Sequence, residues 1–218
     1  VIKTGSYKIA LYNEAMVSLL SAFCGVFSAD ATQKGLSLLK DKENTMIASE
    51  KVTIIDNPLL DNGLSSAPFD DEGVATYTKE IIYEGKLNTL LHNLKTAHKQ
   101  GVKSTGNGFK VSYASPVNVS ESNLYLRAGE KSFEDLMKEI NEGLIITDLA
   151  GLHSGANTVS GDFSLAAKGF YVKNGEKTFP VEQITVAGNY FDLLKNIKNA
   201  QKTSKFFGVF FELKCCIL

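Results

Sequence analysis

The sequence predicts an α+β fold with a strand-rich C-terminal half, and three observations lead to this prediction. An apolar segment of helical length lies near the start, and β-branched segments separated by glycine turns dominate from Leu144 onward. Hydrophobic residues make up 44% of the 218 positions, enough to bury one sizeable core without metals or disulfides. No repeat or Pro-rich linker marks a boundary, so we expect a single domain over residues 1–218.

The first strand and the apolar helix are expected at the N-terminal end. Tyr7–Tyr12 has the composition of a short strand, and Asn13 is suited to cap a helix that continues to about Ala29. Because this helix is apolar nearly all round, its large side chains should be core, namely Met16, Val17, Leu19, Leu20, Phe23 and Val26. A second helical segment is predicted over residues 31–42.

The middle of the chain gives weaker signals. Val52–Asp56 is predicted to be a strand that ends at Asn57-Pro58. A loop then leads to three successive acids, Asp70, Asp71 and Glu72, before a predicted strand pair over residues 75–84 and 86–91. Residues 90–100 fit a helix equally well, with Gly101 as its stop.

The C-terminal half alternates strands with clear turn signals. A strand over 124–127 and a helix over 133–141 are followed by strands over 144–147, 163–172 and 178–186. Asn174-Gly175 lies between the last two strands and is a strong hairpin signal. Residues 189–198 are predicted to form a closing helix.

Composition excludes some classes of function. A net charge of -1, a pI near 6.4 and a single arginine provide no basic field for a phosphate backbone, so nucleic-acid binding is disfavoured. The longest apolar run, Ala15–Phe27, is too short for a membrane span, which needs about 20 residues. Three cysteines form neither a disulfide framework nor a metal knuckle, which indicates a reducing compartment, and we expect a cytoplasmic protein.

The chemically active residue types form no strong motif. The three histidines, His92, His98 and His153, lack the spacing that places two imidazoles on one helix face, and we expect His92 and His98 to be ordinary surface or boundary residues. Ser154 follows His153 in a glycine-rich loop, but this loop leads into a strand, whereas a nucleophile elbow leads into a helix. The acidic run is expected to be a solvated or hydrogen-bonded turn.

Five blocks of sequence, taken in order, resemble the TldD/PmbA family, and specifically its PmbA (TldE) branch. They are Phe69–Gly73, Ser104–Asn107, Gly151–Asn157, Ser160–Ser164 and Pro180–Asn189. The resemblance covers about residues 2–196, the C-terminal half of a typical member, whose N-terminal domain is absent here. It implies a mixed or antiparallel, barrel-like sheet packed around the central apolar helix. The apolar end of the chain, residues 206–218, departs from the family and would need to be paired or buried.

The resemblance also implies a division of labour between two subunits. Family members work as pairs in which a TldD-like metallopeptidase subunit carries His-Glu-x-x-x-His on a helix and binds zinc. The corresponding positions here are Ser21, Ala22 and Val26, and none of these side chains can replace an imidazole or a general base. We therefore expect no cofactor in this chain, zinc in the partner subunit, and a non-catalytic role in processing or degrading small unfolded peptides.

The loop from His153 to Asp162 is predicted to face the partner or the peptide, because a β-edge beside a glycine loop can pair with an extended backbone. The candidate contact residues are His153, Ser154, Gly155, Asn157, Gly161 and Asp162. Self-association also remains open. Two alternatives stay under consideration. One is a hydrolase active by itself through His153 with Ser154 or with an acid from 70–72, and the other is a regulatory protein associated with DNA gyrase.

Overall fold

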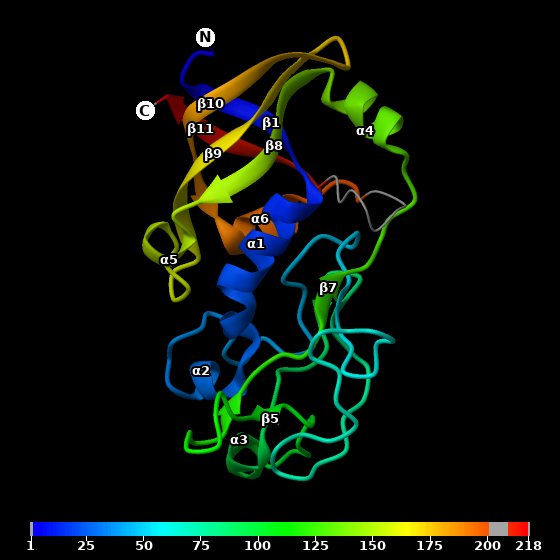
Figure 1. The fold of residues 1–218 in the computed structure, drawn as a ribbon, viewed down its shortest axis with the longest axis vertical. Coiled ribbons are helices and arrows are strands. Elements are labelled where there is room, and N and C mark those ends of the chain that lie inside the picture. Colours follow the sequence, from blue (N-terminus) through cyan, green and yellow to red (C-terminus); the bar gives the residue numbers. More distant parts are fainter. Residues whose placement is uncertain (1, 201–208, 218) are drawn as a thin grey trace. The chain divides into compact units, whose positions relative to one another are not determined.

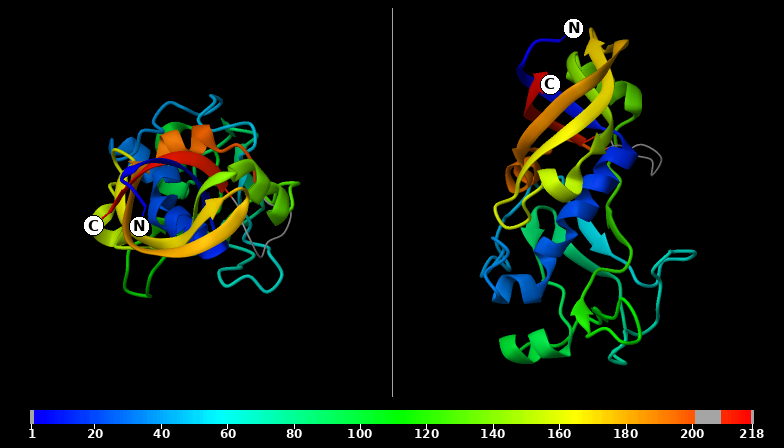
Figure 2. Two further views of the ribbon diagram at one scale, coloured as in Figure 1. Left: turned by 90° about the horizontal axis from the view of Figure 1, so that it is seen from above. Right: turned by 60° about the vertical axis from the view of Figure 1, so that its left-hand side comes forward.

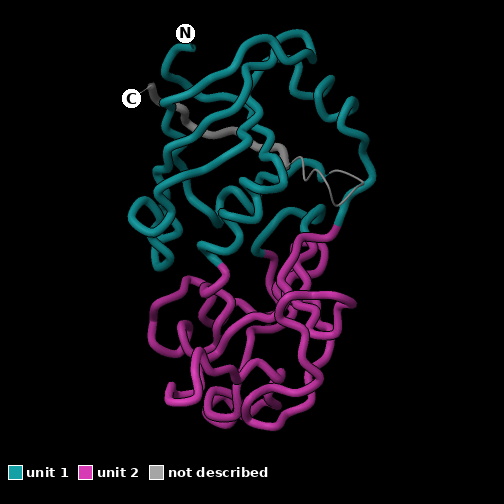
Figure 3. The backbone as a smooth tube through the Cα atoms, in the orientation of Figure 1, with its two compact units in different colours: residues 1–23, 47–52, 128–218 teal, residues 24–46, 53–127 magenta. Residues whose placement is uncertain are grey.

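The computed structural model describes residues 2–200 and 209–217, and the chain divides into two compact units. Unit 1 takes residues 1–23, 47–52 and 128–218, and unit 2 takes residues 24–46 and 53–127 (Figure 3). Both units are assembled from separate stretches of chain, so no single linker separates them in the sequence. The prediction of one domain over 1–218 stays a prediction.

Unit 1 is built on a five-stranded mixed sheet (Figure 1). The strands pair in the order β1-β11-β10-β9-β8, all antiparallel, and β1 also pairs in parallel with β8. Their bounds are β1 Gly5–Leu11, β8 Glu142–Ala150, β9 Asp162–Lys173, β10 Glu176–Asn189 and β11 Val209–Ile217. The α+β class and the mixed, mostly antiparallel sheet are confirmed.

The C-terminal strand β11 gives the apolar end of the chain its backbone partners. It pairs with β1 from Gly5↔Cys215 to Leu11↔Val209, and with β10 from Ile184↔Ile217 to Ala187↔Lys214. This pairing supplies, for 209–217, the backbone partners that the apolar end of the chain was expected to need if it was not buried. Residues 206–208 and 218 of the same segment lie outside the described residues.

The β9–β10 hairpin consists of the two longest strands of unit 1. It twists strongly, as the yellow and orange strands of Figure 2 show. Buried and exposed residues alternate along β9, as expected for a strand with one face on a core. Asn174 and Gly175 form its two-residue loop with φ of 55° and 76°. Positive φ at both positions is the signature of a type I′ turn, so the hairpin prediction is confirmed.

Four helices accompany this sheet, and two aromatic or aliphatic clusters hold them. Their bounds are α1 Asn13–Phe23, α4 Phe133–Ile140, α5 Leu152–Gly155 and α6 Tyr190–Asn196. Helix α4 buries Leu136, Met137 and Ile140 against Ala10, Ile145 and Val172 of the sheet. At the other cluster, the Phe23 ring of α1 stacks on Tyr190 with a centroid distance of 4.4 Å.

Helix α1 differs from the predicted helix in length and in burial. It ends at Phe23, and Cys24–Phe27 forms a 3₁₀ turn (η1) that contains Gly25, a residue of low helix propensity. Val17, expected in the core, is 51% exposed, because the buried side chains form one stripe and not a full circumference. The expectation of a central helix buried on every side is therefore wrong. Across the described part of the chain, no helix is long and apolar enough to cross a membrane.

Unit 2 contains short elements joined by long loops. Its four-stranded sheet has the order β4-β3-β2-β7, and β5 pairs with β6 separately. The strands are β2 Ile54–Asp56, β3 Lys79–Tyr83, β4 Lys86–Leu87, β5 Gly108–Phe109, β6 Asn118–Val119 and β7 Leu124–Leu126. The strands predicted over 75–84 and 86–91 are thus shorter than expected.

The two helices of unit 2 are α2 (Ala29–Gln33) and α3 (Leu94–Gln100). The helix predicted over 31–42 is wrong beyond Gln33. Between the two readings of 90–100, the structure selects the helix, because Asn93 and Thr96 form a capping box at its start. Gly101 ends it with a φ of 73°, as expected.

Candidate functional site

The loop over residues 151–162 is held in shape by its own hydrogen bonds. The Asn157 amide donates to the Asp162 carbonyl at 2.8 Å, and the Gly161 amide donates back to the Asn157 carbonyl at 2.8 Å. The Asn157 side chain accepts from the amides of Val159 and Ser160 at 3.0 and 3.2 Å. Asn157 therefore shapes the loop, although it is exposed to solvent.

Asp162, at the start of β9, is tied to Asn189, its register partner at the end of β10. The Asn189 side-chain amide donates to the Asp162 carboxylate and to the Ser160 carbonyl, both at 2.9 Å. Hydrogen bonds from Asn189 and then Ser160 lower the pKa of Asp162 from its ordinary value. The Asn189 oxygen in turn accepts the amide of Phe191 at the start of α6, so one side chain joins the loop to that helix.

Two of the predicted contact residues are glycines that lie against other groups. A Cβ on Gly161, whose φ is 85°, would lie 2.6 Å from the Phe191 ring. A Cβ on Gly155 would lie 2.3 Å from the carbonyl oxygen of Ser164. Both positions thus require glycine for packing, which is a structural reason for the glycine-rich composition of this loop.

His153 and Ser154 are brought to the surface but not to each other. Both are exposed in α5, and the Ser154 hydroxyl donates to the Gly151 carbonyl at 3.3 Å. Within the described residues no hydrogen bond joins the imidazole to this hydroxyl. A serine nucleophile needs a base within hydrogen-bond reach, so this geometry does not favour the hydrolase alternative.

The acidic run, the other part of that alternative, caps backbone amides. Asp70 is 3% exposed and accepts the amides of Glu72, Val74 and Gly108 at 2.9–3.0 Å. Asp71 accepts the Lys110 amide, and Glu72 accepts the Leu94 amide at the start of α3, both at 2.7 Å. The expected hydrogen-bonded turn is confirmed.

The residues that the resemblance matches to the family's zinc-binding positions have side chains that do not fit a zinc ion. Ser21 has a neutral hydroxyl, Ala22 has no donor atom, and Val26 is a buried hydrocarbon in η1. Among residues 2–200, whose side chains the structure describes, no three His, Cys, Asp or Glu side chains gather into a group that could hold a metal ion. We therefore assign no chemistry of this chain to a metal.

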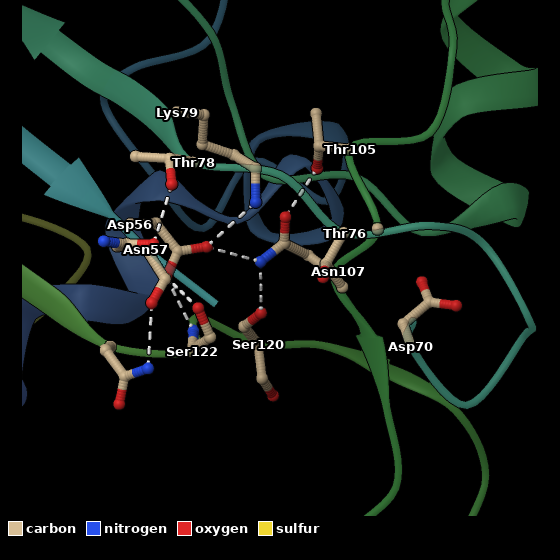
Figure 4. A network of polar contacts seen from close by, with 12 residues as sticks. Asp56, Asn57, Asp70, Thr76, Thr78, Lys79, Thr105, Asn107, Ser120 and Ser122 are labelled. Carbon is tan, nitrogen blue, oxygen red and sulfur yellow. Dashed lines mark hydrogen bonds and ion pairs between the residues drawn. The ribbon is translucent and has the colours of Figure 1, made fainter. Parts of the chain in front are cut away.

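Unit 2 contains a buried polar network around Asp56, shown in Figure 4. Lys79 donates to one carboxylate oxygen at 3.1 Å, and the Asn107 amide donates to the same oxygen at 2.9 Å. The amide and hydroxyl of Ser122 reach the other oxygen at 2.8 and 2.6 Å. Thr105 donates to the Asn107 oxygen at 2.8 Å, which fixes the orientation of that amide.

Burial and charge act in opposite directions on Lys79. Its side chain is 2% exposed and that of Asp56 is 0% exposed. Burial lowers the pKa of Lys79 from its ordinary value, while Asp56 and, less strongly, Asp70 oppose that effect. The ion pair joins β2 to β3, and the hydrogen bonds from Asn107 and Ser122 add two loops to this centre.

The sequence did not predict this network. His92 was expected at the surface or at a boundary, and this is wrong, because it is 1% exposed. His98 is exposed, as expected. One signal was available, because Thr105 and Asn107 belong to the block Ser104–Asn107 that carries the family resemblance. The partners Asp56 and Lys79 lie in other segments, and only folding brings them together.

The β9–β10 hairpin, the hydrogen-bonded loop over residues 151–162 and the polar network around Asp56 together characterise one class of protein. This class is the C-terminal domain of a metallopeptidase-related family. Residues 4–212 match the family described as PmbA/TldA metallopeptidase C-terminal domain. The chain belongs to the PmbA/TldD family.

Curated relatives agree with this assignment. The chain is 34% identical over 196 residues to Metalloprotease PmbA of Escherichia coli O157:H7, covering 90% of this chain and 41% of the relative. It is 32% identical to the Metalloprotease PmbA homolog of Haemophilus influenzae, with the same coverage. The chain thus spans about two fifths of the length of these relatives.

Solved structures show the same fold. A candidate modulator of a DNA gyrase from Thermotoga maritima superposes with a TM-score of 0.89 at 43% identity, over 99% of this chain and 51% of that one. TldE from Thermococcus kodakarensis superposes with a TM-score of 0.85 over 99% of this chain and 50% of that one, and its 24% identity supports the fold alone.

Proposed function

We propose that this chain is part of a TldE-type subunit that contributes docking surface, and no catalytic metal, to a cytoplasmic complex acting on small unfolded peptides. A TldD-like metallopeptidase subunit would be the partner and would hold the zinc. One observation carries the proposal: the zinc-binding positions of the family are occupied by Ser21, Ala22 and Val26, which supply neither ligands nor a general base.

The loop over residues 151–162 is the proposed contact surface, and its residues divide into two groups. Gly155, Asn157, Gly161 and Asp162 are engaged within the loop or with its neighbours, so they would give the surface its shape. His153, Thr158 and Val159 are exposed, and Val159 is 40% exposed. These side chains would touch the partner or peptide, because no hydrogen bond of the loop depends on their side chains.

Pairing of a peptide backbone with the sheet beside this loop is not the best supported mode of contact. Within unit 1, each of β1, β8, β9, β10 and β11 has a neighbour on both sides along its paired registers. A peptide backbone would therefore find few unpaired groups there, and contact through the loop's side chains is the better supported mode.

The test is a binding titration with a purified TldD-like subunit. Replacing His153 with Ala and Val159 with Ser should raise the dissociation constant about tenfold or more, equivalent to about 1.4 kcal/mol. His98→Ala is the matched control, because it removes an exposed imidazole from unit 2. Unchanged affinity of the double variant would sink the loop assignment, and absence of any binding would sink the complex.

The same preparation distinguishes the alternatives. Peptide cleavage should require the partner and its zinc, measured with an unstructured peptide. Cleavage by this chain alone that Ser154→Ala abolishes would favour the hydrolase. Recovery with DNA gyrase and not with the peptidase subunit would favour the regulatory protein.

A further inference from the structure

His92 is a buried titratable side chain that the proposed function does not use. It is 1% exposed, and among the described residues neither Nδ1 nor Nε2 makes a hydrogen bond of normal geometry, although the Thr96 backbone lies near enough to act weakly on the ring. A neutral imidazole tolerates such a position at the cost of one unsatisfied donor and one unsatisfied acceptor, whereas an imidazolium would bury an unpaired charge. The site therefore accommodates one protonation state much better than the other.

The backbone of His92 holds the loop over residues 104–107. Its amide donates to the Thr105 hydroxyl at 2.7 Å. Its carbonyl accepts the Ser104 hydroxyl at 3.1 Å and the amides of Thr105 and Asn107, each at 3.3 Å. Since Asn107 donates its side-chain amide to Asp56, the position of His92 is coupled to the buried network of Figure 4.

The charged groups around His92 offer little compensation to an imidazolium. Glu43 is the carboxylate that acts on the ring, and it already accepts the Leu90 amide at 3.2 Å and the Gln100 side chain at 2.7 Å. Asp30 of the neighbouring helix α2 pairs with Lys34, which follows that helix, and Lys95 and Lys99 of α3 are exposed cations. Glu72 caps the Leu94 amide at the start of α3.

We propose that His92 is an acid-sensitive latch in unit 2: protonation of its imidazole drives the ring toward water and releases the 104–107 loop together with Asn107. Burial is the largest effect on the ring and lowers the pKa of His92, and the opposing effects of Glu43 and the Thr96 backbone are smaller. A histidine whose folded-state pKa is lowered stabilises the fold fully above its unfolded value of about 6.5. That contribution is lost as pH falls from about 6.5 toward the folded-state pKa.

Hydrogen exchange at the Thr105 and Asn107 amides tests the latch directly. After correction for intrinsic exchange rates, their protection should fall by up to about tenfold per pH unit below pH 6.5. In His92→Leu, which cannot titrate, the protection should not follow this pH dependence. His98→Gln is the control, since it removes an exposed histidine and should leave the decrease unchanged.

A second measurement, made on the wild-type protein, does not require His92→Leu to fold. Titration of the wild-type imidazole by NMR should give a pKa for His92 below 6.5. An imidazole that titrates at or above 6.5 while the 104–107 amides remain protected would overturn the latch. So would a decrease in protection that is equal in wild type and His92→Leu.

Discussion

Asp56 and His92 lie in the same unit, and both are almost fully removed from solvent. The carboxylate of Asp56 is surrounded by Lys79, Asn107 and Ser122, so its charge is paired and hydrogen-bonded. Among the described residues, the imidazole of His92 makes no hydrogen bond of normal geometry. At the residue scale, Asp56 keeps its charge because that charge is paired, whereas His92 is sensitive to protonation. The reason is that burial penalises any charge that is left unpaired.

Asp56→Ala should reduce the free energy of unfolding by about 3–5 kcal/mol, because it leaves the Lys79 ammonium buried and unpaired. Denaturant titration measures this loss. Asp30→Ala is the matched control: it removes one partner of the exposed pair with Lys34, where a change within about 1 kcal/mol is expected. A loss below about 1 kcal/mol in Asp56→Ala would contradict the central role given to the network.

Cys24 should be nearly inert toward alkylating reagents. Burial, followed by the nearby Glu121 carboxylate, raises the pKa of this thiol to about 12. At pH 8 the reactive thiolate then amounts to roughly one molecule in ten thousand. Iodoacetamide labelling followed by peptide mass spectrometry should detect little modification of Cys24 until the protein is denatured. Labelling of the folded protein as fast as of the denatured chain would refute this expectation.

At the scale of elements, glycines decide how closely strands and loops approach. In β9, a Cβ on Gly169 would lie 1.8 Å from the carbonyl oxygen of Ile145 on β8, and the loop glycines Gly155 and Gly161 are crowded in the same way. The Asn189 side chain then ties the loop to β9 and α6. Packing therefore explains much of the composition of the 151–162 loop, which contains His153 and Ser154.

Gly169→Ala should separate β8 from β9 and lower the unfolding midpoint, at a cost of at least about 1–3 kcal/mol for forced overpacking. Thermal unfolding followed by circular dichroism measures the shift. Gly25→Ala introduces the same methyl group where nothing lies within 4 Å, so it should cost far less. Equal shifts in the two variants would mean that the close approach at Gly169 does not constrain the sheet.

At the scale of the whole molecule, the five blocks that carry the family resemblance divide between the two units, with two blocks in unit 2 and three in unit 1. Phe69–Gly73 and Ser104–Asn107 adjoin in unit 2, where the Asp71 amide donates to the carbonyl of Gly108 at 2.9 Å. In unit 1, Ser160–Ser164 and the block ending at Asn189 are joined by hydrogen bonds of 2.9 Å. The resemblance therefore follows segments that hold each unit together.

The purified chain should contain far less than one zinc ion per molecule, because the positions corresponding to the family's ligands are Ser21, Ala22 and Val26. Elemental analysis measures the metal content. Addition of EDTA should leave the unfolding midpoint unchanged, since a metal that binds only the native state would raise it by mass action. Stoichiometric zinc, with a midpoint lowered by EDTA, would refute the metal-free assignment.

Much of unit 1 could be predicted from local pattern. The hairpin at Asn174-Gly175 and the strands flanking it were expected, because turn chemistry and alternation act within a few residues. The exposed Val17 was not, because a helix sequence that is apolar all round does not specify which side meets the core. In unit 2, the short strands depend on pairing across long loops, which local propensity does not encode.

The sequence by itself determined the α+β class, the hairpin and the family, because each depends on residue type and local order. Only the tertiary structure decided that Asp56 meets Lys79, that His92 is buried, and that the 151–162 loop is internally bonded. Burial and hydrogen bonding between distant segments are properties of the folded chain, and they set the charge state and exposure of these groups.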